Sequence, residues 1–322
     1  MKFDLNNKRI LIAGHEGMVG QALCRRLSGE GCEVVTVARN DLDYRDQEAV
    51  KNWLQYQNLD GVVIAAAKVG GIMANVENPA SFFYDNIMIS TNIINGAYEA
   101  GVSKLLFLGS SCIYPQECRQ PITEDMLLTS ALEPTNEAYA LAKISGLKMA
   151  QFYRTQYGSD FISAMPCNLF GVGDSYDEEG SHVIPALIMK AHKAKTEGTN
   201  TLTLWGSGTP LREFLNVDDL ADGLVFLLQN YSDIQHINIG AGQEISIKKL
   251  AEIICDIVGF RGEICFDNSH PDGTLRKIMD ITNIKNLGWY PPVLNGSSND
   301  YQSYLIRSIK QSYEDYLKRY PQ

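Results

Sequence analysis

Short apolar runs alternate with amphipathic stretches through the first half of the chain. Five runs rich in valine, isoleucine and leucine have the length of buried strands: Arg9–Gly14, Glu33–Val37, Asp60–Ala67, Lys104–Gly109 and Phe161–Pro166. Helical periodicity follows in QALCRRL, over Pro79–Ala100, and from near Pro134 to about Tyr157. This alternation predicts an α/β fold with a parallel, doubly wound sheet.

The regular alternation of strand-like and helical segments ends at Gly171. A polar, acidic loop over 171–182 is expected to be mobile or to cover a ligand. Beyond it we expect helices at His182–Lys193, Ser246–Val258 and Tyr301–Tyr320. Strands are expected at Thr201–Trp205, His236–Gly240 and Glu263–Phe266. Between them, a strand-like segment over Arg212–Val217 leads into a helix that Asp218 or Asp219 is expected to cap. We therefore predict a second, smaller mixed α/β domain that binds substrate. The first domain would span 1–173, completed by about 214–240, and the second 174–213 and 241–322.

Composition and charge exclude several classes of function. The 322 residues carry a formal net charge of −10, which gives no general attraction for nucleic acid or an anionic membrane. The seven cysteines are odd in number and scattered, which predicts a reduced, cytoplasmic protein without structural zinc or another metal. The polar N-terminus is no signal peptide, and no apolar run approaches the roughly 20 residues of a membrane span.

A glycine-rich turn, GHEGMVG, joins the first strand to the first helix. Gly14 would allow the tight turn, Gly17 would let the backbone approach a pyrophosphate, and Gly20 would let the helix pack on the strand. The helix N-terminus offers amides and a positive dipole end to phosphates. The turn therefore predicts a Rossmann dinucleotide site, while a ligand-free glycine turn is the alternative.

The residue after the second strand distinguishes NAD from NADP. An acidic residue there accepts from the ribose 2′-hydroxyl, whereas an arginine accommodates a 2′-phosphate. The first charged residue is Arg39, which favours NADP. Glu16 lies in the glycine turn near the expected phosphate and weakens that inference, and Arg39 could also stack on adenine or be solvated.

Tyr139 and Lys143 form a Y-x-x-x-K pair that a helix would place one turn apart on one face. An ammonium near a phenol lowers the pKa of the phenol from near 10. Tyr139 could then exchange a proton with a carbonyl or alcohol while hydride moves to or from nicotinamide, with Ser110 bonding the same oxygen. A chance pairing of Tyr and Lys is the alternative.

Cys112 follows the end of the fourth strand at the expected site. A thiol can remove a proton from carbon next to a ketone, because its pKa is tunable toward neutrality. The opposing acid would be His182. Buried cysteines usually only pack, and a lone histidine is more often structural.

Seven motifs together extend this picture over nearly the whole chain: GHEGMVG, AAAKVGGIMAN, LGSSCIYP, EPTNEAYALAK, SHVIPAL, LWGSGTPLREFLNVDDLA and PDGTLRK. The chain resembles the GDP-L-fucose synthases, which are extended short-chain dehydrogenases/reductases. The resemblance implies an NADPH-dependent 3,5-epimerase/4-reductase acting on a GDP-4-keto-6-deoxy sugar. It makes Tyr139 the proton donor, helped by Ser110 and Lys143, and Cys112 and His182 the base and acid of two epimerisations.

The resemblance also implies two sets of binding residues. Those for the cofactor are Gly14, His15, Glu16, Gly17, Met18, Val19, Gly20, Arg39, Leu108, Gly109, Ser110, Ser111, Lys143, Pro166, Cys167, Asn168, Leu169 and His182. Those for the GDP-sugar are Lys190, Trp205, Arg212 and Asp272. Lys190 and Arg212 suit a diphosphate in an acidic chain, although Arg212 could instead pair with Asp218. The helices over Pro79–Ala100 and Pro134–Tyr157 are expected to pair in a homodimer.

Three alternatives remain. A GDP-L-colitose synthase would act on a GDP-4-keto-3,6-dideoxy sugar and epimerise carbon 5 only. A nucleotide-sugar 4-epimerase or dehydratase with bound NAD would share the fold without needing Cys112 and His182. A non-catalytic NADPH-sensing module would need neither Tyr139 nor Lys143.

Overall fold

The computed structural model describes residues 2–177, 181–269, 272–295 and 300–321. Its main sheet has six strands in the order β10-β5-β4-β3-β1-β2, and every pair in it is parallel. The strands are β1 (Arg9–Ala13), β2 (Glu33–Val35), β3 (Gly61–Ile64), β4 (Lys104–Leu108), β5 (Asp160–Pro166) and β10 (Ile237–Ile239). The predicted parallel, doubly wound sheet is confirmed. The strand order reverses between β1 and β3, and such sheets bind ligands at that switch point.

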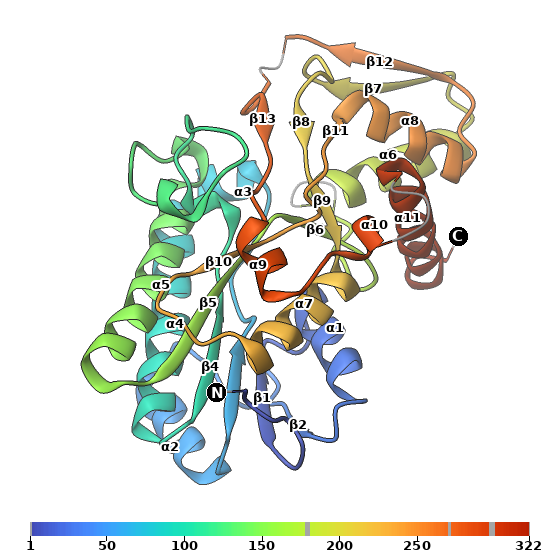
Figure 1. Cartoon of the computed structure of the whole chain (residues 1–322). Coiled ribbons are helices and arrows are strands. Elements are labelled where there is room, and N and C mark those ends of the chain that lie inside the picture. The colour runs from blue at the N-terminus through green and yellow to red at the C-terminus, as the bar shows by residue number, and fades with distance from the viewer. Residues whose placement is uncertain (1, 178–180, 270–271, 296–299, 322) are drawn as a thin grey trace.

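Helices cover both faces of the main sheet. Figure 1 shows α1 and α7 on one side and α2, α4 and α5 on the other. Their bounds are α1 Met18–Leu27, α2 Gln47–Gln57, α4 Pro79–Glu99, α5 Glu137–Tyr157 and α7 Val217–Asn230. The sequence pattern missed α2 because only Val50 and Leu54 of its side chains are buried. Asp46 begins α2, and its carboxylate accepts from the Ala49 amide.

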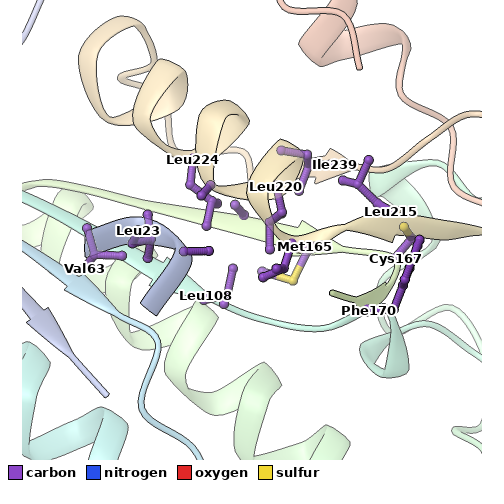
Figure 2. Packing of buried hydrophobic residues seen from close by; sticks show 14 of the residues in the cluster. Leu23, Val63, Leu108, Met165, Cys167, Phe170, Leu215, Leu220, Leu224 and Ile239 are labelled. Carbon is purple, nitrogen blue, oxygen red and sulfur yellow. The ribbon is translucent and has the colours of Figure 1, made fainter. Parts of the chain in front are cut away.

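The core explains why the strand segments are uniformly apolar. Leu23 of α1 and Leu220 and Leu224 of α7 lie over Val63 and Met165 of the sheet, all nearly inaccessible to solvent (Figure 2). A strand covered by helices on both faces cannot alternate apolar and polar side chains without burying polar groups.

The later part of the chain forms three smaller sheets, ordered β11-β8-β13, β12-β7 and β6-β9. Figure 1 shows β7, β8, β11, β12 and β13 gathered at one end of the molecule, with α6, α8 and α11 beside them. The strands are β6 (Asn168–Phe170), β7 (Thr201–Trp205), β8 (Leu211–Arg212), β9 (Phe214–Asn216), β11 (Ile245–Ser246), β12 (Glu263–Asp267) and β13 (Arg276–Lys277). The helices are α3 (Ile72–Glu77), α6 (Val183–Thr196), α8 (Ile247–Val258), α9 (Thr282–Leu287), α10 (Pro292–Asn295) and α11 (Tyr301–Arg319). The smaller, mixed set of elements was expected; the domain boundaries themselves stay a prediction.

Three local predictions were wrong. Residues 168–170, expected in a loop, form β6, because they pair with Phe214–Asn216 of β9. Helix α7 is capped by Asn216, whose side chain accepts from the Asp218 amide, rather than by Asp218 or Asp219. Strand β2 ends at Val35 instead of Val37.

The remaining general features come from the described part of the chain. None of its helices combines the length and apolar character that crossing a membrane requires. All seven cysteines are free thiols. No group of three or more His, Cys, Asp or Glu side chains in these ranges is arranged to hold a metal ion. Residues 178–180 of the acidic loop expected to cover a ligand lie outside the described residues.

Candidate active site

The glycine turn follows β1 at the switch point of the sheet. Gly14 has φ +90, and a Cβ there would lie 2.6 Å from the backbone of Ala66. A Cβ on Gly20 would lie 2.1 Å from the Gly14 carbonyl oxygen, so α1 can approach this closely only with glycine. Gly17 begins α1, which receives no hydrogen bond from a capping side chain. The turn thus has the cradle and the amide donors that fit the phosphates of a dinucleotide.

Glu16 lies in this turn and Arg39 follows β2, and both are exposed. The pKa of Asp43 is lowered to about 2, mainly by its hydrogen bond to Arg45 and to a smaller extent by the charge of Arg39. Burial raises the pKa of the neighbouring Tyr44, and the charge of Glu16 adds to that rise. The charges of Glu16 and Arg39 therefore act on two adjacent residues, Tyr44 and Asp43.

Lys143, Tyr139 and Ser110 meet at the carboxyl end of β4. Lys143 is buried, and its Nζ donates to the Leu108 carbonyl oxygen at 2.8 Å and lies 5.8 Å from the centre of the Tyr139 ring. Burial lowers the pKa of Lys143 to about 8. The Ser110 hydroxyl is hydrogen-bonded to the Tyr139 phenol.

The expectation that Lys143 lowers the pKa of Tyr139 was wrong. Burial raises the phenol pKa, the nearby Cys112 raises it further, and only the Ser110 hydrogen bond opposes this. The Lys143 ammonium is directed to the Leu108 carbonyl oxygen instead of the phenol. Tyr139 is therefore a protonated phenol at neutral pH, which is the form that donates a proton.

Cys112 lies in a short 3-10 helix, η1 (Ser111–Ile113), that packs against α5. Its amide donates to Ser110 Oγ at 3.2 Å, and its half-buried thiol accepts from Asn136 Nδ2 at 3.6 Å. The sulfur also interacts electrostatically with Tyr139. We call Ser110, Cys112, Tyr139 and Lys143 the thiol–phenol cluster. Asn136 was not among the predicted site residues, because its only signal in the sequence is an asparagine at the start of a helix.

His182 comes from a different part of the chain. It precedes α6 as the N-cap residue, and its side chain caps no amide. The imidazole is accessible to solvent, yet the protein atoms around it desolvate it and lower its pKa. It is therefore mostly neutral at neutral pH. A meeting of His182 with Cys112 across a substrate stays a prediction.

The remaining predicted cofactor residues follow β4 and β5. Gly109 is packed so closely that a Cβ would lie 2.2 Å from Met165 Sδ. Asn168 begins β6, and its Nδ2 donates to the Glu213 carbonyl oxygen at 2.9 Å. The Cys167 thiol is buried, and burial raises its pKa far enough to keep it neutral.

The four predicted GDP-sugar residues also lie together. Lys190 Nζ is 5.3 Å from the centre of the Trp205 ring, and 63% of the Trp205 surface is exposed. Asp272 accepts from the Ser207 amide at 2.9 Å and from Ser207 Oγ at 2.6 Å. The Arg212 guanidinium interacts electrostatically with Asp272. We call Lys190, Trp205, Arg212 and Asp272 the cation–tryptophan patch.

Strand register connects this patch to the main sheet. Arg212 ends β8, two residues before Phe214, and Phe214 pairs with Asn168 just beyond the carboxyl end of β5. The alternative pairing of Arg212 with Asp218 was wrong, because Asp218 is bonded to Arg25 at 2.6 Å. Of the patch, Arg212 is thus connected through β9 and β6 to the carboxyl end of β5.

Comparison with known proteins agrees with this arrangement. Residues 10–240 match the model of the NAD dependent epimerase/dehydratase family. A GDP-L-fucose synthase of Sinorhizobium fredii is 53% identical over 94% of this chain and 96% of its own length. A GDP-L-colitose synthase of Yersinia pseudotuberculosis is 37% identical over 87% of this chain and 92% of its own.

Among solved structures, a GDP-L-fucose synthetase of Naegleria fowleri bound to NADP superposes with a TM-score of 0.86 at 29% identity, covering 98% of this chain and 95% of that one. The fold, the glycine turn and these likenesses point the same way. The chain therefore belongs to the NAD dependent epimerase/dehydratase family and, within it, to the GDP-L-fucose synthase family.

Proposed function

We propose that this chain converts GDP-4-keto-6-deoxy-D-mannose to GDP-L-fucose, by epimerisation at carbons 3 and 5 and reduction at carbon 4 with NADPH. The observation that carries the proposal is the thiol–phenol cluster. A 4-epimerase or dehydratase needs the Tyr139 phenol but has no use for a thiol beside it. The relative at 53% identity carries the fucose name, and the one at 37% the colitose name.

Epimerisation starts at the Cys112 thiolate. A ketone at sugar carbon 4 acidifies the hydrogens on carbons 3 and 5, because the carbanion is stabilised as an enolate. The Cys112 thiolate removes one of these protons and becomes a thiol, while the imidazolium form of His182 returns a proton to the opposite face and becomes neutral. Proton exchange with water then restores the thiolate and the imidazolium, and the same two transfers at the second carbon complete the isomerisation.

Reduction follows at the Tyr139 phenol. NADPH, when bound, supplies the hydride for carbon 4. Tyr139 gives its proton to the carbonyl oxygen, and the Ser110 hydroxyl, which is bonded to that phenol, holds the same oxygen in line. Lys143 orients the cofactor ribose from its position at the Leu108 carbonyl oxygen. The glycine turn from Gly14 to Gly20 would hold the cofactor's pyrophosphate, and Arg39 would meet its 2′-phosphate.

The cation–tryptophan patch holds the GDP moiety. Lys190 and Arg212 supply the positive charge for the diphosphate, in a chain whose net charge is −10. The exposed Trp205 ring offers a face for stacking a guanine base, and Asp272 accepts hydrogen bonds from the base or ribose.

The assembly is a cytoplasmic homodimer in this proposal. Helices α4 and α5 pack side by side and leave aromatic side chains exposed, including Tyr84 and Phe152 at 56% and 64%. A second copy covering this face would bury them in a four-helix interface. In sedimentation, a Phe152→Glu variant should give monomers where the wild type gives dimers, if this face is the interface.

The experiment that tests the function uses purified enzyme, NADPH and the keto sugar in D₂O. We expect absorbance at 340 nm to fall and deuterium to enter carbons 3 and 5 of the product. Cys112→Ser should stop deuterium entry, and Cys265→Ser, another half-buried cysteine on β12, should not. Normal exchange at both carbons in Cys112→Ser would remove Cys112 as the base. Faster turnover of the 3,6-dideoxy keto sugar would favour the colitose alternative.

A further inference from the structure

Asn136 occupies a capping position that its side chain does not use. Asparagine is among the residues most favoured at a helix N-cap, where its side chain accepts from a first-turn amide and stabilises the helix. Asn136 is the N-cap of α5, yet it makes no such bond. Its Nδ2 donates instead to Cys112 Sγ at 3.6 Å. The local preference of the sequence has therefore been overridden by a contact with the thiol.

The other end of the same amide makes this arrangement costly. Asn136 Oδ1 is buried, and no side chain or backbone group among the described residues donates to it. A neutral thiol is a weak acceptor, so its hydrogen bond to Asn136 Nδ2 would not offset the loss of the helix cap and the unsatisfied Oδ1 oxygen. A thiolate is a charged acceptor, and charge-assisted hydrogen bonds are roughly twice as strong as neutral ones. The geometry therefore suits the ionised form of Cys112.

We propose that Asn136 is the positioning residue that holds Cys112 as a thiolate, aimed for proton abstraction. This rests on the proposed function, in which Cys112 is the epimerisation base. Asn136 acts through its Nδ2 donor and is assisted by the N-terminus of α5, whose dipole favours negative charge. It touches the sulfur and is not itself required to reach the sugar.

Other ionisable groups around the sulfur do not replace this donor. The Tyr139 phenol of α5 stays protonated, because burial raises its pKa, and it is hydrogen-bonded to Ser110. Lys143 is directed to the Leu108 carbonyl oxygen. Glu137 is exposed in the first turn of α5. His182 precedes α6 and is mostly neutral because its pKa is lowered. Among the described residues, Asn136 Nδ2 is thus the side-chain donor that is hydrogen-bonded to the sulfur.

The test measures thiol ionisation without substrate. Alkylation of Cys112 by iodoacetamide is followed across pH by mass spectrometry of its peptide, in the full chain. Asn136→Asp keeps the size, removes the donor and adds a negative charge, so the pH midpoint should rise by about one unit. Asn136→Ser, which keeps a favoured capping residue, should raise it by a smaller amount. Deuterium entry at neutral pH should fall about tenfold in Asn136→Asp, in step with the lost thiolate.

Asn78 supplies the matched control. It precedes α4 in the same way, is exposed, and its Nδ2 donates to the Ala74 carbonyl oxygen. Asn78→Asp should leave the Cys112 midpoint unchanged. An unchanged midpoint in both Asn136 variants would overturn the inference, even if the wild type epimerises. If the wild type shows no deuterium entry at all, the proposed function fails, and the alkylation midpoint still decides whether Asn136 stabilises the thiolate.

Discussion

The thiol–phenol cluster and the cation–tryptophan patch differ mainly in their access to water. Lys143 is 5% exposed and Trp205 is 63% exposed. In the cluster, burial is the dominant influence on pKa: it raises that of Tyr139 and lowers that of Lys143. In the patch, water and dissolved ions screen the interactions between exposed charges. Buried groups thus have protonation states set by the fold, whereas the patch depends on charge and exposed surface.

Loss of the phenol should produce the largest effect. Tyr139→Phe removes the proton donor for the carbon 4 oxygen and leaves the ring packing, so NADPH oxidation should slow by about 10²- to 10⁴-fold. Deuterium entry at carbons 3 and 5 should persist, because it depends on Cys112. Stopped-flow absorbance and product NMR measure both, and equal loss of the two steps would contradict separate roles.

Lys143 gives the cluster a pH limit. Its pKa of about 8 means that the ammonium is present below pH 8 and is lost above it. If its charge is needed, the rate of reduction in the enzyme should decline as pH rises through about 8. A pH profile of kcat/KM reports this limit for the free enzyme. A flat profile from pH 7 to 9.5 would argue against a role for the charge.

Lys190 tests the exposed patch. Lys190→Ala removes one charge from the proposed diphosphate site, so KM for the GDP-sugar should rise about tenfold with little change in kcat. Adding salt should raise the wild-type KM and have less effect on the variant. Lys193 on the same helix is the comparison residue, and Lys193→Ala should behave like the wild type. A fall in kcat alone would place Lys190 in the chemistry instead.

Asp174 lies outside both regions and should give the smallest effect, on stability only. Burial raises its pKa to about 7 from 3.8, so the folded chain holds a proton that the unfolded chain has released. Stability from this group is full below about pH 4 and is lost as pH rises through 7. Asp174→Asn should gain stability relative to wild type between pH 5 and 8, measured by urea unfolding. A constant difference across that range would contradict the raised pKa.

Side-chain pattern predicted the main sheet well because each strand is buried on both faces. The run Lys104–Leu108 is an example, in which even the lysine is covered and bonds Asp160 at 2.8 Å. Helix α2 and strand β6 escaped prediction for opposite reasons. Helix α2 buries too few side chains to show a clear helical periodicity of apolar residues. Strand β6 is a strand only because it pairs with β9.

The sequence by itself determined the glycine turn, the strand–helix alternation and the helical spacing of Tyr139 and Lys143, because these depend on neighbours within one or two turns of chain. Tertiary structure decided the rest. Burial cannot be read from a local sequence pattern. It raises the pKa of Tyr139, whereas the neighbouring Lys143 had suggested a lowered pKa. Chain packing also turned Asn136 from a helix cap into a partner of Cys112, because a contact 24 residues away outweighed the local preference.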